Sequence, residues 1–176
     1  MAELTNLESK LGEVIGLAQA GQAATKKVKT LARKEKQKDL VETLDKMAQE
    51  AAETAKRGTE VAGRFEGKKS AIQKKARETK EKASEMMDTY LDEEPDALDG
   101  FEFLTMAEAG EVGHWTVVEK LNEDARNRDV QQLVDWAKPI QERHFQQAIE
   151  LEEALRAVPV RFGAVPVPVT VVREAA

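Results

Sequence analysis

The chain contains no cysteine, few aromatic residues and no long hydrophobic run. The absence of cysteine excludes disulfides, thiolate nucleophiles and cysteine-ligated zinc or iron–sulfur centres, so any metal site must use histidine and carboxylate ligands. Aromatic residues make up only 5% of the chain, and the core is therefore expected to consist mainly of Ala, Leu and Val. No apolar run approaches the roughly 20 residues of a membrane-spanning helix. The N-terminus also lacks the pattern of a secretory signal, so we expect a cytoplasmic protein without a membrane partner.

Charge is distributed unevenly along the chain. Residues 1–90 hold 19 Lys and Arg against 15 Asp and Glu, whereas residues 91–176 hold 8 against 18. The two halves thus carry net charges of +4 and −10 and should attract each other. The lysine-rich stretch over 68–82 is interleaved with glutamate and contains no aromatic residue, which is typical of a solvated helix face. Nucleic acid is therefore not favoured as a partner.

Apolar residues recur at intervals of three and four over most of the chain, which indicates amphipathic helices. We predict four core helices over about 4–33, 39–65, 98–126 and 129–157, and an additional helix with a narrow apolar stripe over about 68–91. The additional helix is long enough to join two antiparallel hairpins as a crossover. The predicted fold class is all-α: a four-helix bundle within residues 1–157, followed by an extended, Pro- and Val-rich tail over 158–176.

The two hairpin turns are marked unequally. A short turn is predicted near Asn127, between the third and fourth core helices. The turn between the first two helices is placed at residues 33–38, where the apolar stripe weakens, but this segment contains neither Gly nor Pro. One continuous, much longer helix is the alternative.

The only two histidines fall on the last two core helices, in the patterns Glu111-x-x-His114 and Gln141-x-x-His144. Residues three apart share a helix face, and on a helical wheel these side chains fall within the apolar stripes. Counting from the second turn places Glu111 level with His144 and His114 level with Gln141. Glu108 lies one turn away at the edge of the stripe. We therefore predict one compact, buried cluster across this hairpin, whose members must be paired or metal-bound.

Inward-facing Glu-x-x-His motifs on a pair of bundle helices resemble the ferritin-like superfamily of dimetal carboxylate proteins. Segments 107–115 and 140–145 are similar to the second helical hairpin of small bacterial ferritin-like proteins, some of them associated with stress. The resemblance covers about residues 3–157. It implies two hairpins joined by a crossover and a role in metal handling or redox stress.

The sequence departs from the ligand set of that family. Glu13 on the first helix is expected to point to solvent and Glu8 to lie at the edge of its stripe. Glu50 and Glu53 on the second helix lie off the stripe, and Gln141 stands where the family has a glutamate. Two metal ions need about four carboxylates, so we expect an incomplete or altered metal site.

Three interpretations of the cluster remain open. Glu108, Glu111, His114 and His144 could bind Fe or Mn, with Zn as an alternative and with Gln141 hydrogen-bonded behind them. The same residues could instead form a buried hydrogen-bond network in a non-catalytic interaction or stress-protection bundle without metal. A small-ligand pocket is the third interpretation.

Two further expectations concern packing and partners. Gly110 and Gly113, which flank Glu111, are expected to allow close approach of a neighbouring helix. A homodimer is the expected assembly, and the tail over 158–176 could contact a partner chain or lie along its own bundle.

Overall fold

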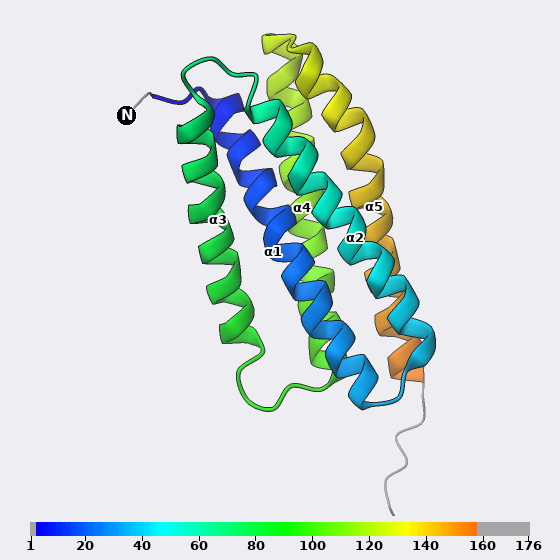
Figure 1. Cartoon of the computed structure of the whole chain (residues 1–176). Coiled ribbons are helices and arrows are strands. Elements are labelled where there is room, and N and C mark those ends of the chain that lie inside the picture. Colours follow the sequence, from blue (N-terminus) through cyan, green and yellow to red (C-terminus); the bar gives the residue numbers. More distant parts are fainter. Residues whose placement is uncertain (1–2, 158–176) are drawn as a thin grey trace, which may run out of the picture.

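Five α-helices make up the part of the chain that the computed structural model describes, residues 3–157 (Figure 1). They are α1 (Asn6–Lys34), α2 (Lys38–Ala62), α3 (Lys69–Tyr90), α4 (Ala97–Ala125) and α5 (Arg128–Ala157). These residues contain no β-strand, which confirms the predicted all-α class. None of the five helices combines the length and the hydropathy that crossing a bilayer requires. The predicted tail over 158–176 lies outside the described residues.

The helices pack as one bundle in which α1 is the central element. α1 packs against α2, α3 and α4, while α5 packs against α4 and, less extensively, against α2. Helix α3 runs along the outer side of α1, at the edge of the bundle (Figure 1). The chain thus forms an α1–α2 hairpin, returns along the bundle through α3, and forms an α4–α5 hairpin.

Both predicted hairpin turns are present. The α1–α2 turn occupies residues 35–37, so the alternative of one continuous helix is wrong. Lys36 has a φ of 62°, and this left-handed conformation reverses the chain without glycine. At the α4–α5 turn Arg126 is also left-handed, with a φ of 50°. The side chain of Asn122 binds both the N–H and the C=O of Asn127, which fixes this second turn.

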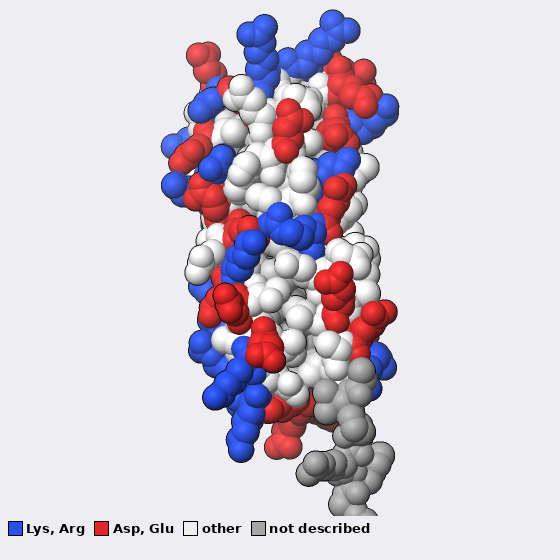
Figure 2. All heavy atoms as spheres, turned by 90° about the vertical axis from the view of Figure 1, so that its right-hand side faces the viewer, with Lys and Arg blue, Asp and Glu red and all other residues white. Residues whose placement is uncertain are grey.

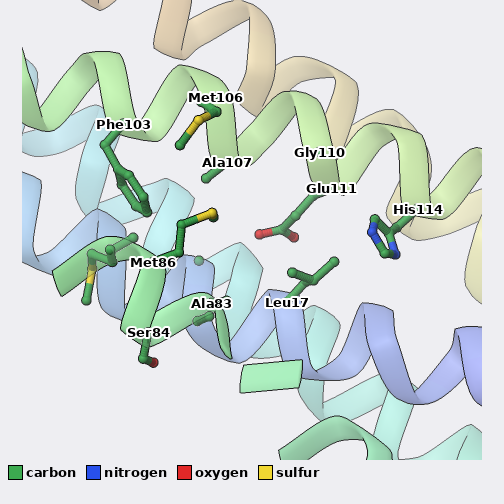
Figure 3. A pocket seen from close by; sticks show the side chains of 14 residues that line it. Leu17, Ala83, Ser84, Met86, Phe103, Met106, Ala107, Gly110, Glu111 and His114 are labelled. Atoms are coloured by element: carbon green, nitrogen blue, oxygen red, sulfur yellow. The ribbon is translucent and has the colours of Figure 1, made fainter. Parts of the chain in front are cut away.

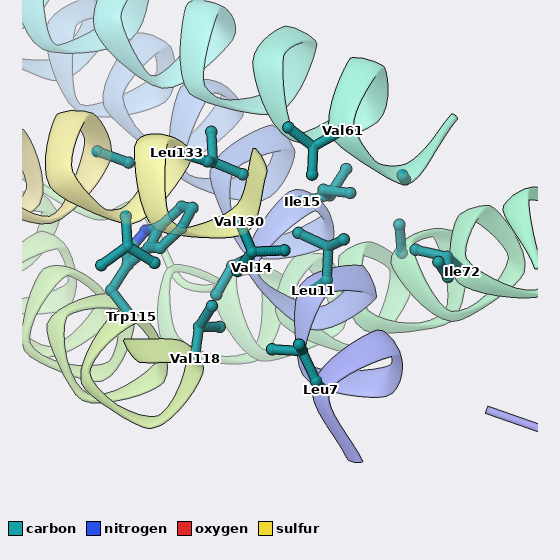
Figure 4. Close-up of a cluster of buried hydrophobic side chains, with 14 residues drawn as sticks. Leu7, Leu11, Val14, Ile15, Val61, Ile72, Trp115, Val118, Val130 and Leu133 are labelled. Atoms are coloured by element: carbon teal, nitrogen blue, oxygen red, sulfur yellow. The ribbon is translucent and has the colours of Figure 1, made fainter. Parts of the chain in front are cut away.

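Two clusters of buried apolar side chains fill the two ends of the bundle. The first includes Leu11, Val14 and Ile72 together with Trp115 and Val130 (Figure 4). The second surrounds Leu44, Met47, Phe101 and Leu104 at the opposite end. Both clusters draw on helices from the two halves of the chain, and burial of these side chains is the main source of stability. The interval between them is where Glu108, Glu111, Gln141 and His144 lie.

Ion pairs reinforce the contact between α2 and α5. Arg64 pairs with Asp129 near one end, and Arg143 Nη2 lies 2.7 Å from Glu50 Oε1 near the middle. Arg64–Asp129 pairs a base of the first half with an acid of the second, as the charge distribution predicts, whereas Glu50–Arg143 pairs the two halves in the opposite sense. Figure 2 shows charges of both signs interspersed around uncharged surface on one side of the bundle.

Glycines allow α3 to lie very close to α1. A Cβ atom at Gly12 would lie 2.8 Å from the carbonyl oxygen of Ile72, and one at Gly16 would lie 2.3 Å from that of Ala76. Ile72 and Ala76 are the only buried residues of α3. The N-terminal half of α3 is therefore fixed to α1 by backbone-to-backbone contact, whereas its C-terminal half has no buried residue.

We expect Gly16→Ala to destabilise the protein, because the added methyl group would overlap the α3 backbone. Overpacking of this kind costs about 1–3 kcal/mol, which should outweigh the gain of up to about 1 kcal/mol in helix propensity. Urea denaturation measures the free energy of unfolding. Gly113→Ala is the matched control, because a Cβ there has no neighbour within 4 Å and should stabilise the protein. Equal stabilisation by both variants would contradict the close α1–α3 contact.

Candidate functional site

The middle of the bundle, between the two apolar clusters, contains a group of buried polar side chains. Glu108, Glu111, Gln141 and His144 are all buried, and His144 is only 2% exposed. The inward orientation predicted for Glu111, Gln141 and His144 is therefore correct, and Glu108, expected at the edge of the stripe, is buried as well. His114 departs from the prediction, because 35% of its side-chain surface remains exposed.

Helix geometry explains why the predicted cluster divides. Successive residues of an α-helix are rotated by 100°, so positions three apart point in directions that differ by about 60°. Glu108 faces α5, Glu111 faces Gly21 of α1, and His114 faces Glu13 of α1. The three side chains thus spread like a fan across the inner surface of α4. Residues that share a face on a helical wheel here meet different neighbours.

Glu108 and His144 belong to a hydrogen-bonded group that joins α2, α4 and α5. The amide of Gln141 donates a hydrogen bond to Glu108 Oε2, and His144 Nδ1 lies 3.8 Å from the same oxygen. On its other side, His144 Nε2 lies 2.8 Å from Glu50 Oε2. Glu50 also binds Arg143, so its carboxylate has two cationic or hydrogen-bonding partners.

These contacts correct the predicted pairing. Gln141 meets Glu108 rather than His114, and the contacts of His144 are with Glu108 and Glu50 rather than with Glu111. The sequence predicts that Glu50 lies off the apolar stripe of its helix. In the structure its long side chain reaches inward from the edge of α2 to His144. The sequence feature that could have indicated this contact is the position of Glu50 beside the buried stripe, because a long acidic side chain there can reach a buried histidine.

Glu13 also lies differently from the prediction. Its side chain is 17% exposed rather than directed to solvent, and it pairs with Lys10 and with Lys75 of α3. His114 Nδ1 lies 3.4 Å from Glu13 Oε2 without forming a hydrogen bond in acceptable geometry, so this buried nitrogen has no partner among the described residues. Burial, together with the charge of Lys10, lowers the pKa of His114 although Glu13 opposes the change.

A cavity of about 180 Å³ lies between α1, α3 and α4, next to Glu111. Its walls are mostly apolar and include Leu17 and Phe103. Met86 and Met106 also line it and are 46% and 43% exposed, so the cavity reaches the surface between α3 and α4. Figure 3 shows the carboxyl group of Glu111 pointing from α4 into this space.

The glycines around Glu111 shape the cavity rather than bring helices together. A Cβ atom at Gly110 or Gly113 would have no neighbour within 4 Å, so the close approach expected at these two positions is wrong. Gly21 instead makes room for the acid, because a Cβ there would lie 2.5 Å from Glu111 Oε1. Gly110 lines the cavity, whereas Gly113 does not.

Burial changes the protonation of the central acids. It raises the pKa of Glu108 to about 8, although the hydrogen bond from Gln141 opposes the increase. Burial, with a further contribution from the nearby charge of Glu108, raises the pKa of Glu111 well above its usual range. Glu50 is less buried, and hydrogen bonds from His144 and Arg143 outweigh burial and lower its pKa. Burial lowers the pKa of His144, so this imidazole tends to be neutral.

As they lie, these residues do not fit a resident metal ion. Within residues 3–157, no group of three His, Asp or Glu side chains is arranged to hold one. Because the α4 side chains point in different directions, His114 lies apart from the group around His144. Gln141 already binds an oxygen of Glu108, and Arg143 already neutralises Glu50. No step of a mechanism is therefore assigned to a metal here.

The raised pKa of Glu108 predicts how stability depends on pH. Between about pH 4.5 and 8 the unfolded chain has lost this proton while the folded protein retains it, so the contribution of Glu108 to stability decreases as pH rises. Glu108→Gln removes the effect. The stability of the variant relative to the wild type should increase by about 1 kcal/mol or more from pH 5 to pH 9. Urea denaturation over this range measures it, and parallel pH profiles would contradict the assigned burial.

Comparison with protein-family models, with curated proteins and with solved structures finds no significant match to this chain. The function must therefore be argued from the cavity and the polar residues themselves.

Proposed function

We propose that this protein binds a small, largely apolar molecule in the cavity between α1, α3 and α4. The observation that carries the proposal is Glu111, a carboxyl group that is 5% exposed, points into the cavity and accepts no hydrogen bond from any residue in 3–157. His114 Nδ1, on the same cavity, is fully buried without a partner among the described residues, and a buried polar group of this kind costs about 1–3 kcal/mol. Such local costs are retained most often where they serve a function.

The energetics of the cavity support the same conclusion. Empty apolar space loses packing contacts and therefore lowers stability. A molecule that filled the space and supplied a hydrogen-bond partner to Glu111 would offset both costs at once. The exposed edge formed by Met86 and Met106 suits such a role, because methionine side chains are flexible and adapt to different apolar surfaces.

Helix α3 provides a route of entry. Its buried residues, Ile72 and Ala76, lie in its N-terminal half, whereas the cavity is lined by its C-terminal half, including Ala83 and Met87. Segments with few buried contacts open most readily. Outward movement of this half of α3 would admit a ligand without breaking the α1–α3 glycine contact.

A ferritin-like relationship remains part of the proposal at the level of topology. Two hairpins joined by a helix that runs along the bundle support it. Metal handling, which the ferritin-like resemblance implies, is the second candidate, although no three acidic or histidine side chains of residues 3–157 are arranged to hold an ion. Elemental analysis tests it: stoichiometric Fe or Mn that is lost in His144→Ala would support metal binding, and metal-free protein would contradict it. The dimer and the contacts of the tail also stay predictions.

The ligand proposal is tested by blocking the cavity. Toluene, a neutral apolar probe, should raise the melting temperature of the wild type because it binds only the folded state. Gly110→Leu should abolish this increase by placing a side chain at the cavity wall, where a Cβ meets nothing within 4 Å.

Gly113→Leu is the matched control for this experiment. It makes the same change on α4, also in open space, but away from the cavity. It should bind toluene as the wild type does. No increase in the wild type, or an equal increase in Gly110→Leu, would contradict the proposal.

A further inference from the structure

The ligand class follows from what the cavity provides. Its volume of about 180 Å³ compares with the roughly 150 Å³ of an engineered apolar protein cavity that accommodates benzene. The wall is made mostly of aliphatic, methionine and phenylalanine side chains, and its polar side chains are Ser84, Glu111 and His114. An aromatic ring or a short branched chain with one small polar group therefore matches the space.

The polar end of the cavity restricts the polar group. The Glu111 carboxyl has no donor from residues 3–157, and no lysine or arginine of this part of the chain lines the cavity. Lys10 and Lys75, whose charges act on the neighbouring His114, pair with Glu13. A ligand must therefore bring its own N–H or O–H donor to satisfy Glu111.

Charge favours an amine among the possible donors. Glu108, the second buried carboxyl, acts on Glu111 electrostatically and adds to the acidic character of this region. Burial favours the protonated form of both acids, and a cationic amine beside Glu111 would favour its ionised form and create a charged pair, which an anionic ligand cannot do. Hydrogen bonds in which one or both groups are charged are also stronger than neutral ones.

We propose that the cavity binds a small aromatic or branched aliphatic amine, with the apolar part between α3 and α4 and the amino group on the Glu111 carboxyl. This inference rests on the proposed ligand-binding function and adds the chemical class of the ligand. Gly21 is part of the same site, because the absence of a side chain there leaves the carboxyl its place.

Three probes of nearly equal size separate the contributions: toluene, benzyl alcohol and benzylamine. NMR chemical-shift titration of the full chain gives each Kd. Benzylamine should bind wild-type protein at least about tenfold more tightly than benzyl alcohol, which corresponds to about 1.4 kcal/mol. Glu111→Gln should reduce this ratio to near one while leaving the Kd of toluene unchanged.

Two further variants complete the test. Glu119 lies on the same helix as Glu111 but pairs with Lys138 outside the cavity, so the Glu119→Gln variant should keep the amine preference. Gly21→Ala retains the acid but displaces its carboxyl, and should lose the preference even if Glu111→Gln folds poorly.

The outcomes distinguish the two proposals. If toluene does not bind the wild type, the cavity is not a ligand site and both proposals fail. If toluene binds but benzylamine is not preferred, or if the preference survives in Glu111→Gln, the amine inference is overturned while the ligand-binding function stands.

Discussion

Burial of the Glu108 and Glu111 carboxyls between two apolar clusters is the constraint on which the interior of this bundle depends. The two acids lie three residues apart on α4 and meet opposite conditions. Glu108 is held by Gln141 and lies near His144, whereas Glu111 faces a cavity and has no partner among the described residues. A bundle selected only for stability would pair both acids or replace them with apolar residues. This difference is what supports the proposed binding role of Glu111, whereas Glu108 is held within the bundle by Gln141.

The arrangement of α3 bears on how a ligand could reach the buried Glu111 carboxyl. Two glycines of α1 bring the first half of α3 into backbone contact, and the second half extends over the cavity without a buried residue. The cavity therefore lies beside the part of α3 that has no buried side chain, and the exposed methionines mark its opening. Leu91, directly after α3, is buried in the second apolar cluster, so access would require the segment between Ala76 and Leu91 to move outward.

Much of the fold could be predicted from the sequence because apolar periodicity reports directly on helices. The five helices, both turns and the inward orientation of Glu111 and His144 follow from it. The composition of the site could not be predicted in the same way. A helical wheel does not show that Glu108 faces α5 while Glu111 and His114 face different residues of α1. It also does not show how far a long side chain at a stripe's edge, such as Glu50, reaches inward. The cavity exists because neighbouring helices leave a gap between them. Apolar periodicity does not report which helices contact each other, so it could not predict this gap.

The most direct test of the central claim is a crystal structure of the protein soaked with a brominated benzylamine, in which anomalous scattering locates the bromine. The account predicts bromine between α3 and α4, with the amino group within hydrogen-bonding distance of the Glu111 carboxyl. A collapsed cavity, or a Glu111 carboxyl paired with a lysine or arginine of the chain itself, would contradict it.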